Sequence, residues 1–97
     1  MPTTTFYPNS RKVALAANAV TIVPGSERAL QLQIPAGSTV TVATTIASGD
    51  DISAGTADWF TWADGAKLGP YIKEIPPCTA IRLTNGAAAG YVNLMQA

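Results

Sequence analysis

The chain has 97 residues, and its six basic and six acidic side chains cancel to a formal net charge of zero. Charged residues make up 12% of the sequence, about half of the share in an average soluble domain. This composition argues against nucleic acid and anionic membranes as partners, since both are bound through clustered Lys and Arg. It favours association with other protein surfaces.

The sequence also lacks the residue types on which most catalytic and metal sites depend. It contains no His and a single Cys, so it has no imidazole base, no internal disulfide and no ligand set for zinc. The glycine motifs that bind phosphate are missing as well. We therefore predict a protein that is not an enzyme and that needs neither a cofactor nor a metal ion. The absence of a signal-peptide pattern and of long apolar runs predicts synthesis in the cytosol.

Residues 1–10 are predicted to form an extended arm, followed by a single β domain over residues 11–97. Two prolines in the arm oppose a helix, and a run of three Thr favours extended backbone. The arm also carries an aromatic pair, Phe6 and Tyr7. We expect this pair to contact either its own domain or a neighbouring molecule.

Alternation of apolar with polar or small residues predicts a series of short strands after the arm. The clearest is ALQLQIP, in which Leu30, Leu32 and Ile34 alternate with glutamines. The predicted strands cover residues 11–17, 19–23, 30–34, 39–46, 59–62, 71–75, 80–84 and 91–95. Turns are predicted between them, among others at Pro24-Gly25 and, as a hairpin, at Asp64-Gly65. Residues 47–57, rich in Gly, Ser and Asp, are predicted to form a loop.

Seven or eight short strands with turn signals every 8–12 residues are typical of a small antiparallel β-sandwich or a jelly-roll-like barrel. No segment shows a convincing apolar stripe with the 3.6-residue period of a helix. The alanine content of residues 14–20 permits a helix, but their β-branched neighbours and the lack of a cap make a helix the weaker interpretation. At this length the core is modest, so oligomerisation would add to its stability.

Four of the six acidic residues fall within fifteen positions, at Asp50, Asp51, Asp58 and Asp64. One interpretation is a calcium site, although the spacing fits no EF-hand loop. The favoured interpretation is a solvated loop in which Asp side chains cap turns. A third is that this segment meets basic residues of another copy and sets the register of assembly. The basic residues considered for that contact are Arg11, Lys12 and Arg28.

Trp59, Phe60 and Trp62 supply three of the seven aromatic residues. They form either a contact platform or part of the core, because both faces of one strand are rarely exposed together. We expect at least one Trp in the core. Cys78, the single thiol, is expected to be a small buried apolar residue. The residues predicted to lie at protein interfaces are Phe6, Tyr7, Arg11, Lys12, Asp50, Asp51, Trp59, Phe60 and Trp62.

Residues 58–97 resemble the closing strands of sandwich domains in the small virion proteins of tailed bacteriophages. The resemblance depends on GPYIKEIPP and on the C-terminal AIRLTNGAAAGYVNLMQA. It implies a capsid decoration or cement protein, located in the virion after synthesis in the host cytoplasm. Its partners would be the major capsid protein and further copies of itself, as a dimer or trimer. Residues 2–10 would then reach into the coat lattice, with Phe6 and Tyr7 as anchors.

Two alternatives remain open from the sequence. A carbohydrate-binding β-sandwich module would use Trp59 and Trp62 as a stacking platform for sugar rings. A tail or head–tail structural subunit would be a variant of the virion hypothesis. The length leaves no room for a second, receptor-binding domain, which argues against a fibre.

Overall fold

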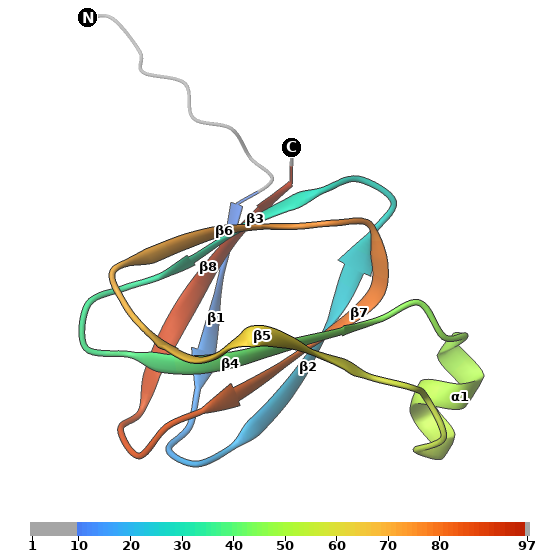
Figure 1. The fold of residues 1–97 in the computed structure, drawn as a ribbon, viewed down its shortest axis with the longest axis horizontal. Coiled ribbons are helices and arrows are strands. Elements are labelled where there is room, and N and C mark those ends of the chain that lie inside the picture. Colours follow the sequence, from blue (N-terminus) through green and yellow to red (C-terminus); the bar gives the residue numbers. More distant parts are fainter. Residues whose placement is uncertain (1–9, 97) are drawn as a thin grey trace, which may run out of the picture.

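Eight β-strands and one short helix follow one another along residues 10–96, the part of the chain that the computed structural model describes (Figure 1). The elements are β1 (Ser10–Leu15), β2 (Val20–Ser26), β3 (Leu30–Ile34), β4 (Thr39–Thr45), α1 (Gly49–Ala54), β5 (Phe60–Leu68), β6 (Tyr71–Ile75), β7 (Cys78–Asn85) and β8 (Gly90–Gln96). Ser10 belongs to β1, so the predicted arm is one residue too long. Its other residues, including Phe6 and Tyr7, lie outside the described range.

The strands pair antiparallel in a nested order, β1 with β8, β2 with β7, β3 with β6 and β4 with β5. Two further pairings, β3 with β8 and β4 with β7, join them into sheets with the strand orders β1-β8-β3-β6 and β2-β7-β4-β5. Such a long hairpin rolled into two packed sheets is the jelly-roll topology. The prediction of a small antiparallel β-sandwich is therefore confirmed.

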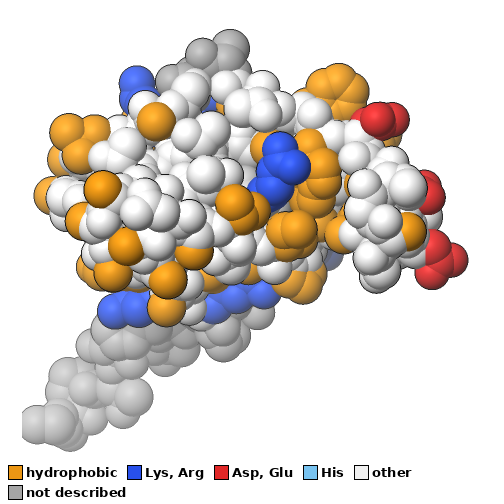
Figure 2. All heavy atoms as spheres, turned by 90° about the horizontal axis from the view of Figure 1, so that it is seen from below, with side chains coloured by type: hydrophobic (Ala, Val, Ile, Leu, Met, Phe, Trp, Pro, Cys, Tyr) orange, Lys and Arg blue, Asp and Glu red, His pale blue; other side chains and the backbone are white. Residues whose placement is uncertain are grey.

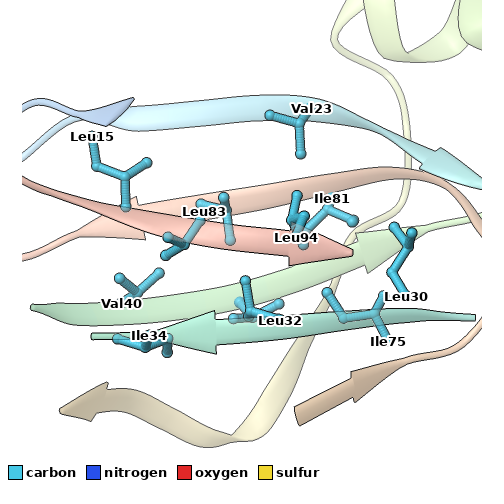
Figure 3. Close-up of a cluster of buried hydrophobic side chains, with 12 residues drawn as sticks. Leu15, Val23, Leu30, Leu32, Ile34, Val40, Ile75, Ile81, Leu83 and Leu94 are labelled. Carbon is cyan, nitrogen blue, oxygen red and sulfur yellow. The ribbon is translucent and has the colours of Figure 1, made fainter. Parts of the chain in front are cut away.

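The core fills the layer between the two sheets, where the alternating apolar residues of both point inward (Figure 3). Leu32 of β3 and the pair Ile81 and Leu83 of β7 are fully buried. Burial of these aliphatic side chains is the main favourable contribution to folding. The buried cluster consists of Leu15, Val23, Leu30, Leu32, Ile34, Val40, Val42, Ile75, Ile81, Leu83, Val92 and Leu94.

The turn predicted at Pro24-Gly25 is wrong, because β2 continues through both residues to Ser26. β2 is an edge strand whose one neighbour is β7. The carbonyl oxygen of Pro24 accepts a hydrogen bond from Arg11, which shows that the backbone polar groups of Pro24 face away from β7. The N–H that Pro24 lacks would therefore not have bonded to β7, so the proline breaks no hydrogen bond of the sheet. Gly25 lies so close to β7 that a Cβ would overlap the Cys78 carbonyl.

The hairpin predicted at Asp64-Gly65 is also wrong, since β5 runs on through it to Leu68. Ala43 of β4 pairs with Thr61 and Thr41 pairs with Ala66, so the four residues 62–65 of β5 lie opposite the single residue Val42 and form an enlarged bulge. Gly65 supplies the positive φ of 64° within it. β5 is an edge strand, where a bulge also blocks further strand pairing.

The predicted loop 47–57 contains a helical turn and a half, α1. The side chain of Ser48 caps its start by accepting a hydrogen bond from the Asp51 N–H, and Gly55 ends it in the left-handed conformation. Asp50 and Asp51 lie in the first turn, where the helix dipole favours negative charge. At six residues the helix is too short to show an apolar period, so its caps are its signal in the sequence.

Candidate protein-binding surface

The segment from Ile46 to Trp59, which we call the lobe, leaves β4, carries α1 and returns to β5. It projects from one end of the sandwich (Figure 1, right). No residue of α1 is buried, so the helix adds little to the core. An ordered segment that contributes no core is free to present its side chains to a partner.

Three side chains at the base of the lobe form what we call the apolar patch: Ile46, Trp59 and Phe60. Ile46 is 81% exposed and Phe60 is 69% exposed, the two highest values among the large apolar residues described. Together with Trp59 they line one shallow hollow, whose wall also includes Asp58. Aromatic residues beside exposed aliphatic ones are typical of the centres of protein interfaces.

Thr45, a buried residue at the end of β4, fixes the two ends of the lobe to each other. Its hydroxyl donates to the carbonyl oxygen of Asp58 at 2.7 Å and accepts from the N–H of Ala47 at 3.1 Å. The guanidinium of Arg82, on the outer face of β7, lies 4.9 Å from the centre of the Trp59 ring. This cation–π contact holds the ring on the outside of the sheet. The patch is therefore preorganised, which lowers the entropy lost on binding.

The lobe side of the patch is acidic, while Arg82 contributes one positive charge at the Trp59 ring. The lobe contains Asp50, Asp51 and Asp58, all exposed, and no Lys or Arg. Figure 2 shows the acidic side chains of that view gathered at this end of the molecule. Among the described residues, no three acidic or thiol groups come close enough together to hold a metal ion. A negative border around an apolar centre favours a partner with basic residues around an apolar cavity.

Trp62 lies outside the hollow that the patch lines. It packs against the core, its indole N–H donates to the Thr44 hydroxyl at 3.4 Å, and the ammonium of Lys73 lies 4.2 Å from its ring centre. The structure thus places Trp59 on the outer face of the sheet and Trp62 against the core. The two tryptophans do not form the shared stacking platform of the carbohydrate hypothesis.

Two of the three predicted basic contacts, Arg11 and Lys12, lie on the other sheet, at the edge strand β1, whereas Arg28 lies between β2 and β3. Arg11 donates to the Pro24 carbonyl at 3.0 Å, and the ammonium of Lys12 lies 4.3 Å from the ring centre of Tyr91. The structure does not join either residue to the lobe within one chain. The predicted contact between these basic residues and the acidic segment therefore requires a second copy.

Two members of this surface, Ile46 and Arg82, were missed by sequence reasoning. Ile46 extends the alternation of β4 and therefore looks like one more strand residue, whereas β4 ends at Thr45. The sequence feature that could have marked Ile46 as exposed is its place directly before a Gly- and Asp-rich segment. Arg82 is a lone charge inside the apolar strand AIRLT, which marks an outward position. Only the fold shows that this position faces Trp59.

Comparison of the chain with protein-family models, with curated proteins and with solved structures finds no match. Within residues 10–96 no helix has the length and apolar character needed to span a membrane.

Proposed function

We propose that the chain is a virion structural protein, a capsid decoration or cement protein that binds the outer shell and stabilises contacts between capsomers. The observation that carries the proposal is the apolar patch, with two strongly exposed apolar side chains beside a held Trp59 and an acidic border. Exposed apolar area of this kind gains free energy when a partner covers it.

Two further points support a virion role over other binding roles. The jelly roll is a recurrent fold of viral capsid domains, although one fold serves many functions. The sequence of residues 58–97 resembles phage virion proteins, and this stretch includes Trp59 and Phe60 of the patch. The proposed partner is the major capsid protein, with further copies of the chain as second neighbours.

The N-terminal segment is the second proposed contact with the shell, through Phe6 and Tyr7. Because β1 begins at Ser10, a variant lacking residues 2–9 keeps all eight strands. We expect this variant to remain folded and to lose shell binding. Full shell binding by the variant would remove these residues from the interface.

The direct test is cosedimentation with capsid shells and, separately, with tails of the phage that encodes the chain, each purified without it. We expect saturable binding to shells and none to tails. Phe60→Asp should weaken shell binding about tenfold or more, because it places a charge in the centre of the interface. Binding to tails alone would support the tail-subunit alternative, and binding to neither would overturn the virion proposal.

Leu68→Asp is the matched control for Phe60→Asp. Both residues are on β5, and they are 63% and 69% exposed, but Leu68 lies at the other end of the strand from the patch. Equal losses of shell binding in both variants would show that any added charge on this edge impairs binding. In that case the apolar patch would not be the specific contact with the shell.

A further inference from the structure

The outer face of the β1-β8-β3-β6 sheet carries a groove made of two adjoining hollows. Gln33, Ile72 and Asn93 line both of them. One hollow extends from these residues to Ser10 and Met95, which pair across β1 and β8, and the other extends to Tyr91 and Pro70. The groove thus runs along the strands, starting at the first residue of β1.

No residue that lines the groove carries a charge, but Lys12 and Glu74 flank it on the same face, and the Lys12 ammonium lies 4.3 Å from the ring centre of the lining residue Tyr91. Its floor alternates amides with apolar side chains. The Asn93 amide donates to the Gln33 side-chain oxygen at 3.0 Å, while Ile72 is 65% and Met95 38% exposed. Such a surface suits an uncharged, extended peptide with apolar side chains, because any buried charge would be left unpaired.

We propose that this groove binds residues 2–7 of the same chain, Pro-Thr-Thr-Thr-Phe-Tyr. These residues contain no charged side chain, and they precede Ser10, which itself lines the groove. The intervening sequence Tyr7-Pro8-Asn9-Ser10 has Pro and Asn at the central positions that β-turns favour. The proposal requires a turn at this sequence, which would reverse the chain and direct the preceding residues over the sheet.

The lengths agree. From Met95 to Tyr91 the groove follows four residue steps of β8, which corresponds to about 13 Å. Six extended residues reach about 20 Å, enough to cover it from end to end. After the reversal, Phe6 and Tyr7 are the first side chains to meet the groove. They enter at its Met95 end, where sulfur–aromatic contacts are favourable.

The short covalent connection between the segment and Ser10 favours binding within one chain over binding to a second copy. A segment joined through a two-residue connection has an effective concentration in the millimolar range, well above that of a second copy in dilute solution. Covering Ile72 and Met95 also removes exposed apolar area from the free protein. The inference concerns the free chain and does not depend on the proposed shell binding.

The test compares the full chain with a variant lacking residues 2–8, using the side-chain NH2 signals of Gln33 and Asn93 in ¹⁵N–¹H NMR spectra. We expect these signals to differ between the two proteins, independently of protein concentration. A synthetic peptide of residues 1–9 should move the signals of the shortened protein towards those of the full chain. The same peptide with Phe6→Ser and Tyr7→Ser should leave them unchanged.

Two substitutions, each made in both the full and the shortened chain, provide the control. Ile72→Glu places a charge in the groove and should make the Asn93 signals of the two chains coincide, whereas Leu68→Glu, at a residue of nearly equal exposure outside the groove, should leave them different. Unchanged backbone signals of buried Leu83 would show that both variants fold. Identical Gln33 and Asn93 signals in the full and shortened chains would overturn the proposal. The proposal would also be overturned if the difference between these signals grew with protein concentration and the full chain had the mass of a dimer. That result would assign the groove to a second copy.

Discussion

The interior of the sandwich and the lobe differ in what their apolar residues do. In the interior, the side chains of Leu32, Ile81 and Leu83 are completely buried between the two sheets. In the lobe, no residue of α1 is buried, and Ile46 is 81% exposed. Residues of the same chemical type therefore stabilise the fold in one region and remain available to a partner in the other.

The comparison implies that stability and binding can be changed separately. Substitutions in the interior should lower the free energy of unfolding, whereas substitutions in the lobe should leave it nearly unchanged. The following predictions test this separation, beginning with the largest effect.

Asn85→Asp should destabilise the fold by about 3–5 kcal/mol, the usual cost of an uncompensated buried charge. The side-chain nitrogen of Asn85, a buried residue at the end of β7, donates to the carbonyl oxygens of Ala16 and Ala88 at 2.8 and 2.9 Å. A carboxylate there loses both bonds and faces the same oxygens. Urea unfolding at pH 7 measures the change.

The matched control for this amide is Asn93→Asp on the outer face of β8. The Asn93 amide is partly exposed and bonds to the flexible side chain of Gln33, which can reverse its own amide to donate. We expect a change within about 0.5 kcal/mol. Equal losses of stability in both variants would show that the buried hydrogen bonds of the Asn85 side chain contribute no more than those of an exposed amide.

Leu32→Ala should cost about 3 kcal/mol, because it removes a fully buried side chain at the centre of the core. Ile46→Ala removes an aliphatic side chain of the same size from the lobe and should cost less than about 0.5 kcal/mol. The pair compares the two regions directly, with thermal unfolding of both variants as the measurement. A loss at Ile46 close to that at Leu32 would contradict the separation of stability from binding.

Two strands were predictable from the sequence to the residue, β3 in the middle of its sheet and β6 at the edge of the same sheet. For β3 and β6 the structure has the predicted bounds, residues 30–34 and 71–75. In β3 one face is buried and the other exposed, and a shift of one residue would expose Leu30, Leu32 and Ile34 together. Where burial differs this strongly between two faces, alternation alone determines the strand.

The edge strands β2 and β5 and the lobe were not predictable in the same way. Pro24-Gly25 and Asp64-Gly65 have the residue types of turns, but both lie in edge strands, where a missing N–H or a bulge breaks few pairings. The patch depends on Arg82, which lies twenty-three positions after Trp59 in the sequence. Strand order, which no local pattern shows, brings these two residues together.

Ser48→Ala removes the cap of α1 and should destabilise the helix by about 1 kcal/mol. Because α1 contributes no buried residue, global unfolding should change by less than about 0.5 kcal/mol. Hydrogen exchange separates the two effects: the Ile52 and Gly55 amides, which bond within the capped turn, should exchange about fivefold faster, while core amides stay unchanged. Faster exchange at Leu83 as well would show that the lobe is coupled to the interior.

The smallest expected effect concerns the thiol of Cys78 at the start of β7. Desolvation by burial raises the pKa of Cys78, and a backbone hydrogen bond at Ser26 offsets part of this rise. The folded chain therefore holds this proton at a pH where the unfolded chain has lost it. Its contribution to stability is complete below the pKa of the unfolded thiol and declines as the pH rises through the folded value.

Alkylation by iodoacetamide, which requires the thiolate, should accordingly reach half its maximal rate at a higher pH in the folded chain than in urea. In Cys78→Ser, the decline of stability at alkaline pH should become shallower, because serine does not titrate in this range. An alkylation midpoint below that of the unfolded chain would mean that a positive charge, and not burial, governs this thiol. The β2–β7 edge would then be a reactive surface in its own right, in contrast to the unreactive interior beside it.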